Sequence, residues 1–68
     1  MNKIVHVVLN EVEGGHSRYV EIRGIKENGE YVSLHKLHYG TKKRKGFNEA
    51  LKVAKLHLKL YKIRYKLN

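Results

Sequence analysis

In the first half of the chain, apolar and polar residues alternate in three short segments, which is the pattern of strands that bury one face. The predicted strands cover residues 3–12, 17–26 and 30–38. Gly14-Gly15 separates the first two strands, and Asn28-Gly29 separates the last two. Because glycine and asparagine adopt the backbone angles that tight turns need, we predict an antiparallel sheet with its strands in sequence order.

A two-residue turn at Gly14-Gly15 brings the apolar residues of the first two strands to one face. The predicted pairs are Glu13 with His16, Leu9 with Val20, Val7 with Ile22, and Val5 with Gly24. One face then gathers Val5, Val7, Leu9, Val20 and Ile22. The other face gathers His6, Val8, Asn10, Tyr19, Glu21 and Arg23. Since strand side chains alternate with a period of two, a slip by one residue would mix the two sets.

The second turn has two interpretations. A two-residue Asn-Gly loop pairs Ile22 with His35. A three-residue loop over residues 27–29, with Gly29 in the left-handed conformation as a bulge, pairs Ile22 with Leu34. We predict the three-residue loop, because it keeps the apolar face continuous and also pairs Gly24 with Val32. The polar face of the third strand then carries Tyr31, Ser33 and His35.

After a basic loop at residues 39–46, the apolar spacing changes to the helical period, which predicts a helix over residues 47–66. Gly46 or Asn48 can cap this helix, with Glu49 in its first turn. One apolar stripe contains Phe47, Ala50, Leu51, Ala54, Leu58, Tyr61 and Tyr65. Beside it lies a lysine stripe of Lys52, Lys55, Lys59, Lys62 and Lys66. A second apolar stripe contains Val53, Leu56, Leu60, Ile63 and Leu67.

These elements predict an α+β fold in which a three-stranded antiparallel sheet packs on one C-terminal α-helix. The first apolar stripe of the helix covers one face of the sheet and leaves the other face uncovered. The second stripe is more than a monomer needs, so it packs beneath the first strand or forms a patch for a partner or a second copy. Residues 59–68 have an alternative as a fourth strand, because K-I-R-Y-K-L also alternates.

The chain has 68 residues, enough for one small domain with a stability of roughly 3–5 kcal/mol. Its 15 Lys+Arg and 6 Asp+Glu give a net charge of +9. This excess favours polyanionic partners, with nucleic acid ahead of an anionic membrane surface. The sequence contains no targeting segment and no apolar run of about 18 residues. We therefore expect a cytoplasmic, nucleoid-associated protein without membrane insertion.

Two groups of residues are candidates for contacts to nucleic acid. The four adjacent basic side chains of Lys42, Lys43, Arg44 and Lys45 repel one another unless an anion compensates their charge, which makes them candidates for contacts to phosphates. Arg18 is a further phosphate-contact candidate. On the uncovered face, Arg23 can present a bidentate donor fork to a guanine edge, and Glu21 can accept from a cytosine amino group or hold Arg23 in place. A cross-strand charge pair without any partner is the alternative interpretation. The other base-contact candidates are Tyr31, Ser33, His35, Asn10 and His6.

Catalytic and metal sites are not expected. The chain has no cysteine, and its five histidines (His6, His16, His35, His38 and His57) do not form a ligand set with suitable spacing. The serines and the threonine have no acidic partner at a persuasive spacing, and there is no phosphate-binding glycine loop. We therefore expect a protein that is not an enzyme and needs no cofactor.

Several short motifs resemble one known family. They are Arg18-Tyr19-Val20-Glu21-Ile22-Arg23, Asn28-Gly29, Val32-x-Leu34, and Glu49-Ala50 followed by Ala54. Residues 18–60 thereby resemble the Apetala/ethylene-response-factor DNA-binding domain and the related arm-site-binding domain of integrases. The resemblance implies a sheet that lies in the major groove, with Glu21, Arg23, Tyr31 and Ser33 at the DNA. The chain departs from the family in the first strand, where His6, Val8 and Asn10 replace basic and tryptophan residues, and in the third strand, where Tyr31 and Ser33 replace arginine and tryptophan.

The expected function is therefore double-stranded DNA binding in an accessory or regulatory role, such as transcription regulation. One alternative is a protein-interaction module, for example a small inhibitor or adaptor from a phage or mobile element, which would use the uncovered sheet face or the second helix stripe. Another alternative is RNA or ribosome binding. We expect a monomer or a weak homodimer.

Overall fold

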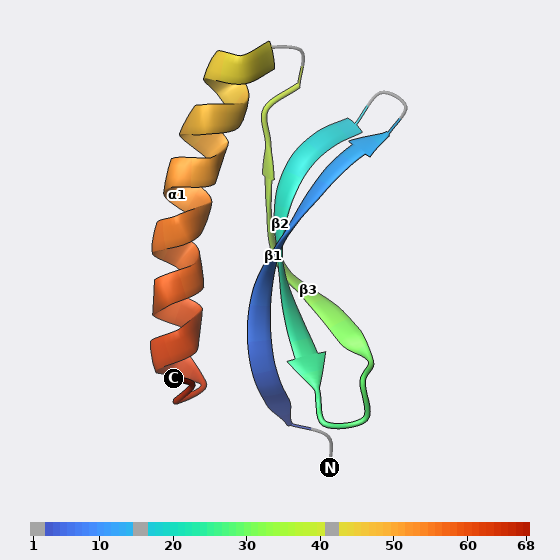
Figure 1. Ribbon diagram of the computed structural model, residues 1–68, viewed down its shortest axis with the longest axis vertical. Helices are drawn as coiled ribbons and strands as arrows, with labels where there is room; N and C mark the ends of the chain where they lie inside the picture. The colour runs from blue at the N-terminus through green and yellow to red at the C-terminus, as the bar shows by residue number, and fades with distance from the viewer. Residues whose placement is uncertain (1–2, 15–16, 41–42) are drawn as a thin grey trace.

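The computed structural model describes residues 3–14, 17–40 and 43–68. Three strands, β1 (Ile4–Gly14), β2 (Ser17–Lys26) and β3 (Tyr31–His38), precede the helix α1 (Lys43–Arg64). The strands form an antiparallel sheet in the order β1-β2-β3, and α1 lies along one side of this twisted sheet (Figure 1). The predicted α+β architecture is confirmed, and the strand bounds differ from the prediction by at most two residues.

The core lies between the central strand and the helix. Val20 and Ile22 of β2 and Ala54 of α1 are fully buried. The small side chains at Ala50 and Ala54 let the helix approach the sheet closely, because they add little volume between the two backbones. The larger side chains around this contact are Leu9, Leu37, Tyr39, Phe47 and Leu51. The first predicted apolar stripe therefore does pack on the sheet.

The register of β1 against β2 differs from the prediction by two residues. Gly14 pairs with Ser17, so β1 is longer than expected and the connection falls on residues 15 and 16, outside the described residues. Leu9 consequently pairs with Ile22 instead of Val20. A shift of two residues keeps each side chain on its predicted face, because the strand period is two. An irregularity between Ile4 and His6 ends this regular pairing near the N-terminus.

The second hairpin combines the two interpretations of its turn. Lys26 donates its backbone N–H to the Glu30 carbonyl at 2.8 Å, which closes the predicted three-residue loop, and Gly29 has the predicted positive φ of 89°. Gly24 pairs with Val32 as expected. A β-bulge then skips Leu34, so Ile22 pairs with His35, and the predicted pairing of Ile22 with Leu34 is wrong. In such a bulge, two residues of one strand face a single residue of its neighbour.

The bulge is tied to the helix by a hydrogen bond. The Tyr61 hydroxyl of α1 donates to the Leu34 carbonyl at 3.1 Å. Bulges interrupt the ladder locally, and a polar group that loses its partner in a half-buried place is costly. The helix therefore helps to hold β3 in its bulged form.

Replacing Tyr61 by phenylalanine is expected to lower the free energy of unfolding by about 0.5–1.5 kcal/mol, because one hydrogen bond is lost while the ring remains. Urea unfolding followed by circular dichroism measures the change. Tyr65→Phe is the matched control, since its ring stacks on that of Tyr61 one turn away. Equal losses in both variants would show that the bond to Leu34 adds no stability.

The helix begins at Lys43, earlier than the predicted residue 47, so the basic segment after Thr41 is not a loop throughout. Gly40, with φ of 57°, ends the extended chain after β3. Lysine and arginine are good helix formers, and Gly46 is tolerated inside the helix at a cost of about 1 kcal/mol. Gly46 is buried, and the adjacent Phe47 ring packs edge-on against Tyr39, which anchors this turn to the sheet.

The helix ends at Arg64 with a Schellman motif, so the alternative fourth strand over residues 59–68 is wrong. Leu67 donates its backbone N–H to the Lys62 carbonyl at 2.7 Å, and Lys66 donates to the Ile63 carbonyl at 3.0 Å. Lys66 has the left-handed φ of 58° that this cap requires. The two bonds satisfy carbonyl groups that the end of a helix leaves without partners.

Candidate nucleic-acid interface

The sheet face away from α1, here called the open face, carries the polar side chains of all three strands. The observed pairs and the alternation of side chains define its members. They are His6, Val8, Asn10 and Val12 of β1; Tyr19, Glu21, Arg23 and Ile25 of β2; and Tyr31, Ser33, Lys36 and His38 of β3. No element of the described chain packs on this face (Figure 1).

Arg23 lies in the middle strand of the open face and is held by two neighbours. Its Nε donates to the Glu21 carboxylate at 2.6 Å. Its guanidinium carbon lies 4.0 Å from the centre of the Tyr31 ring, a cation–π contact. The side chain is 28% exposed. Because Nε donates the hydrogen bond to Glu21, the N–H groups of Nη1 and Nη2 are the donors of Arg23 that can bind a ligand.

Glu21 is the buried anchor of this group. It is only 3% exposed although it belongs to the open face, because its neighbours cover it. Burial alone raises the pKa of the Glu21 carboxyl, but hydrogen bonds from Ser33 and Arg23 and the positive charges of Arg23 and Lys36 bring that pKa below its ordinary value. The carboxylate in turn raises the pKa of Arg23. Of the two predicted roles of Glu21, the geometry fits the one in which it holds Arg23.

A second cation, which the sequence prediction missed, lies on the other side of Glu21. Lys36 pairs with Glu21 across β2 and β3, and its Nζ lies 5.1 Å from the centre of the Tyr19 ring. The His38 ring also lies 5.1 Å from Tyr19. The signal in the sequence that could have placed Lys36 on the open face is the spacing of Leu34 and Leu37. Two residues three positions apart can both face the helix only if the strand is irregular between them. Arg23 and Lys36 therefore form a cationic pair around one buried carboxylate.

His35, predicted as a base-contact residue, lies on the opposite face of the sheet. The bulge at Leu34 turns the His35 ring toward α1, where it stacks on the His57 ring with centroids 4.3 Å apart. The Nδ1 of His57 lies 3.1 Å from the Val53 carbonyl. His35 is therefore part of the contact between sheet and helix, and its assignment to the open face is wrong.

The remaining base-contact candidates lie around Arg23 on the open face. Tyr31 is exposed and covers one side of the guanidinium. Ser33 pairs with Arg23, Asn10 pairs with Glu21, and His6 pairs with Ile25 near one end of the sheet. Tyr31 also pairs with Ile25, so His6 and Tyr31 lie equally far along the sheet from Glu21, on opposite edge strands. Apart from His35, the predicted set is brought onto one surface.

Among the phosphate-contact candidates, residues 43–45 belong to the start of α1 and Arg18 belongs to β2. Residues 43–45 form the first helical turn, which contains no acidic residue, and Lys45 is exposed. Lys42 and the side chains of Lys43 and Arg44 lie outside the described part of the structure. Arg18 is exposed on β2 and alternates with Tyr19, which places it on the helix side of the sheet and not on the open face.

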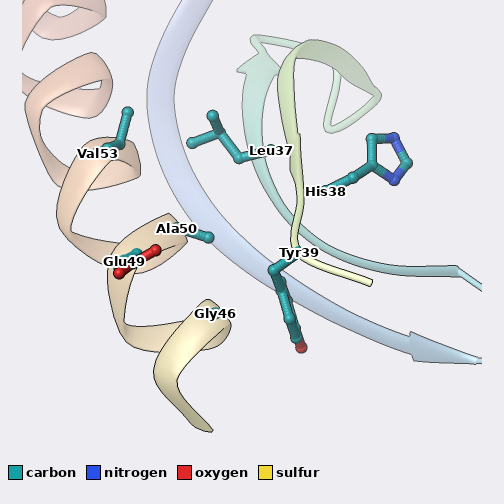
Figure 2. Close-up of a pocket in the computed structure, with 7 residues that line it drawn as sticks. All are labelled: Leu37, His38, Tyr39, Gly46, Glu49, Ala50 and Val53. Atoms are coloured by element: carbon teal, nitrogen blue, oxygen red, sulfur yellow. The ribbon is translucent and has the colours of Figure 1, made fainter. Parts of the chain in front are cut away.

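A hollow between the end of β3 and the start of α1 lacks convergent polar groups. It is lined by Leu37, His38, Tyr39, Gly46, Glu49, Ala50 and Val53. Figure 2 shows the His38 ring pointing away from the Glu49 carboxylate, so these two side chains do not face each other. Among the residues that the structure describes, no three His, Cys, Asp or Glu side chains are grouped so that they could hold a metal ion.

Within residues 3–14, 17–40 and 43–68, no helix is both long and apolar enough to cross a bilayer. Comparisons of the chain with protein-family models, with curated proteins and with solved structures give no significant match.

Proposed function

We propose that this protein binds double-stranded DNA through the open face, with the central strand in the major groove. The observation that carries the proposal is Arg23, which is fixed at the middle of that face by Glu21 and Tyr31. An arginine that is already ordered loses less conformational entropy when its Nη groups bind a guanine edge or a phosphate. A major groove about 12 Å wide admits two neighbouring β-strands.

The charges near Arg23 support the same partner. Lys36 adds a second cation to the open face, while Glu21 is buried beneath the cations. The lysine and arginine residues at positions 42–45 are proposed to contact the phosphates of the DNA backbone. The residues proposed to lie beside the DNA bases are Tyr31, Ser33, Asn10 and His6. The order of strands and helix is also the one that the resemblance to Apetala-type and integrase arm-site-binding domains implies. An accessory or regulatory role fits a domain of this size.

Replacing Arg23 by alanine is expected to weaken binding to a preferred duplex by about 1–3 kcal/mol, roughly five- to 150-fold, and to weaken binding to random duplex DNA less. The preferred duplex comes from selection out of a random library, and fluorescence anisotropy measures the dissociation constants. For the unchanged protein, affinity should fall steeply between about 50 and 200 mM salt, because phosphate contacts release counterions. Single-stranded DNA and RNA of the same sequence should bind more weakly than the duplex.

Arg64→Ala is the matched control, since it removes an equal charge from an exposed position on the helix. Arg23→Lys separates charge from shape, because lysine keeps the charge but lacks the bidentate fork. Equal losses for Arg23→Ala and Arg64→Ala would exclude a specific role of the open face. An absence of duplex binding at 50 mM salt would refute the proposed function.

A further inference from the structure

The exposed part of the second apolar stripe of α1, here called the seam, consists of Val53, Leu56, Leu60 and Ile63. Leu56, Leu60 and Ile63 are 61%, 62% and 65% exposed, and Val53 is 40% exposed. Figure 1 shows that no described part of the chain covers the outer side of α1. Packing beneath β1 is therefore excluded for these four residues, whereas Leu67, the last residue of the predicted stripe, is half-buried and lines a hollow with Val5 and Val7 of β1. Large aliphatic side chains gathered on one exposed surface mark a binding site for a partner.

The spacing of the seam identifies the kind of partner. The intervals between Val53, Leu56, Leu60 and Ile63 are three, four and three residues, which is the alternation of a and d positions in a coiled coil. Such a seam is narrower than the broad apolar face of helices that lie on membranes, and it has no aromatic residue. Glu49, one turn before Val53, ends the apolar seam on the N-terminal side. The occupant that fits this pattern is another amphipathic helix.

The charges beside the seam decide which helix fits. If Val53 is an a position, the g positions are Lys52 and Lys59 and the e positions are His57 and Arg64. In a parallel pair of two copies, Lys59 would face Arg64 of the other copy. In an antiparallel pair, Lys52 would face Lys59. Since like charges oppose each other in both orientations, a second copy is disfavoured.

We infer that the seam binds an amphipathic helix of another protein whose apolar seam is flanked by glutamate or aspartate. Acidic side chains at the partner's e and g positions would pair with Lys52, Lys59 and Arg64 while its aliphatic residues cover Leu56, Leu60 and Ile63. The helix α1 is already folded on the sheet, so only the partner has to become ordered. The seam and the open face lie on different sides of the molecule, and this inference does not depend on DNA binding.

The test uses two designed peptides of about four heptads, with leucine and isoleucine at a and d and with either glutamate or lysine at all e and g positions. Isothermal titration measures binding to the full chain, and circular dichroism measures the helix that the peptide gains. We expect the glutamate peptide to bind and the lysine peptide not to bind. Leu60→Asn should weaken the complex roughly ten- to hundredfold, because one buried leucine is lost from the seam. Val8→Asn, which changes an exposed aliphatic residue on the open face, should leave it unchanged.

Charge reversal gives the second readout. Lys59→Glu changes a residue beside the seam, whereas Lys55→Glu changes an exposed residue one turn earlier that is farther from the seam. We expect Lys59→Glu to weaken binding of the glutamate peptide by about two- to fivefold more than Lys55→Glu does. The melting temperature of each variant shows that folding is intact.

Three results would overturn the inference. Equal binding of both peptides, or binding of neither, would show that the basic side chains beside the seam do not select an acidic helix. Sedimentation equilibrium that reveals a dimer abolished by Leu60→Asn would assign the seam to a second copy. Binding to phosphatidylserine vesicles that is lost in Leu60→Asn and displaces the glutamate peptide would assign it to a membrane surface.

Discussion

Replacing Ile22 by alanine is expected to leave a large part of the protein unfolded at 25 °C. Ile22 is the largest of the fully buried side chains and lies in the central strand. Truncating a buried isoleucine to alanine costs about 2–5 kcal/mol, because apolar contacts are lost and a cavity remains. A domain of this size has only roughly 3–5 kcal/mol of stability to lose. Urea unfolding and the near-ultraviolet circular dichroism spectrum measure the effect.

Ile63→Ala makes the same chemical change at a position that is 65% exposed. Surface substitutions of this kind change the free energy of unfolding by about 0.5 kcal/mol or less, and alanine is also the better helix former. The two variants therefore separate burial from the loss of the side chain itself. If Ile22→Ala were as stable as Ile63→Ala, the core would not lie between β2 and α1 as described.

Replacing Glu21 by glutamine is expected to lower the free energy of unfolding at pH 7 by about 1.5–3 kcal/mol, the range for hydrogen bonds to charged groups. The variant keeps the shape of the side chain but removes the charge that pairs with Arg23 at 2.6 Å. Thermal unfolding measures the difference, which corresponds to a melting temperature lower by roughly 6–24 °C. Glu30→Gln is the control, since it removes the same charge from an exposed residue just before β3.

The effect of Glu21→Gln should depend on pH in a defined direction. The pKa of Glu21 in the folded protein lies below 4.5, the value that the unfolded chain is expected to have. The unfolded state therefore binds the proton more readily, so the contribution of Glu21 is complete well above pH 4.5 and is lost as the pH falls through the folded pKa. The stability difference between the unchanged protein and Glu21→Gln should be constant from about pH 6 to 8 and shrink below pH 4.5. A difference that grows on acidification would contradict the role of Glu21 as a charged anchor.

Local patterns in the sequence determined the elements and most of the faces. Alternation assigned Val20 and Ile22 to the core, and both are fully buried. Helical spacing separated the stripe that packs on the sheet from the seam that stays exposed, since side-chain direction in a helix follows from position alone. The turn at Gly29 was also predictable, because a three-residue loop needs one residue at positive φ. The register of β1 against β2 is shifted by two residues from the prediction, but these assignments to the two faces remain correct because side chains alternate with a period of two.

Only the tertiary structure decided which residues of β3 share a surface with Arg23. A bulge changes the face of every residue after it, and the bulge at Leu34 exchanges His35 for Lys36 on the open face. Its position is set by contacts between segments far apart in the sequence, namely the bond from Tyr61 to Leu34 and the stacking of His57 on His35. The burial of Glu21 has the same origin, because side chains from two strands cover it. The spacing of Leu34 and Leu37 indicates that β3 is irregular, but periodicity within one strand does not show which residues of other elements contact the bulge or cover Glu21. The surface around Arg23 therefore had to come from the fold.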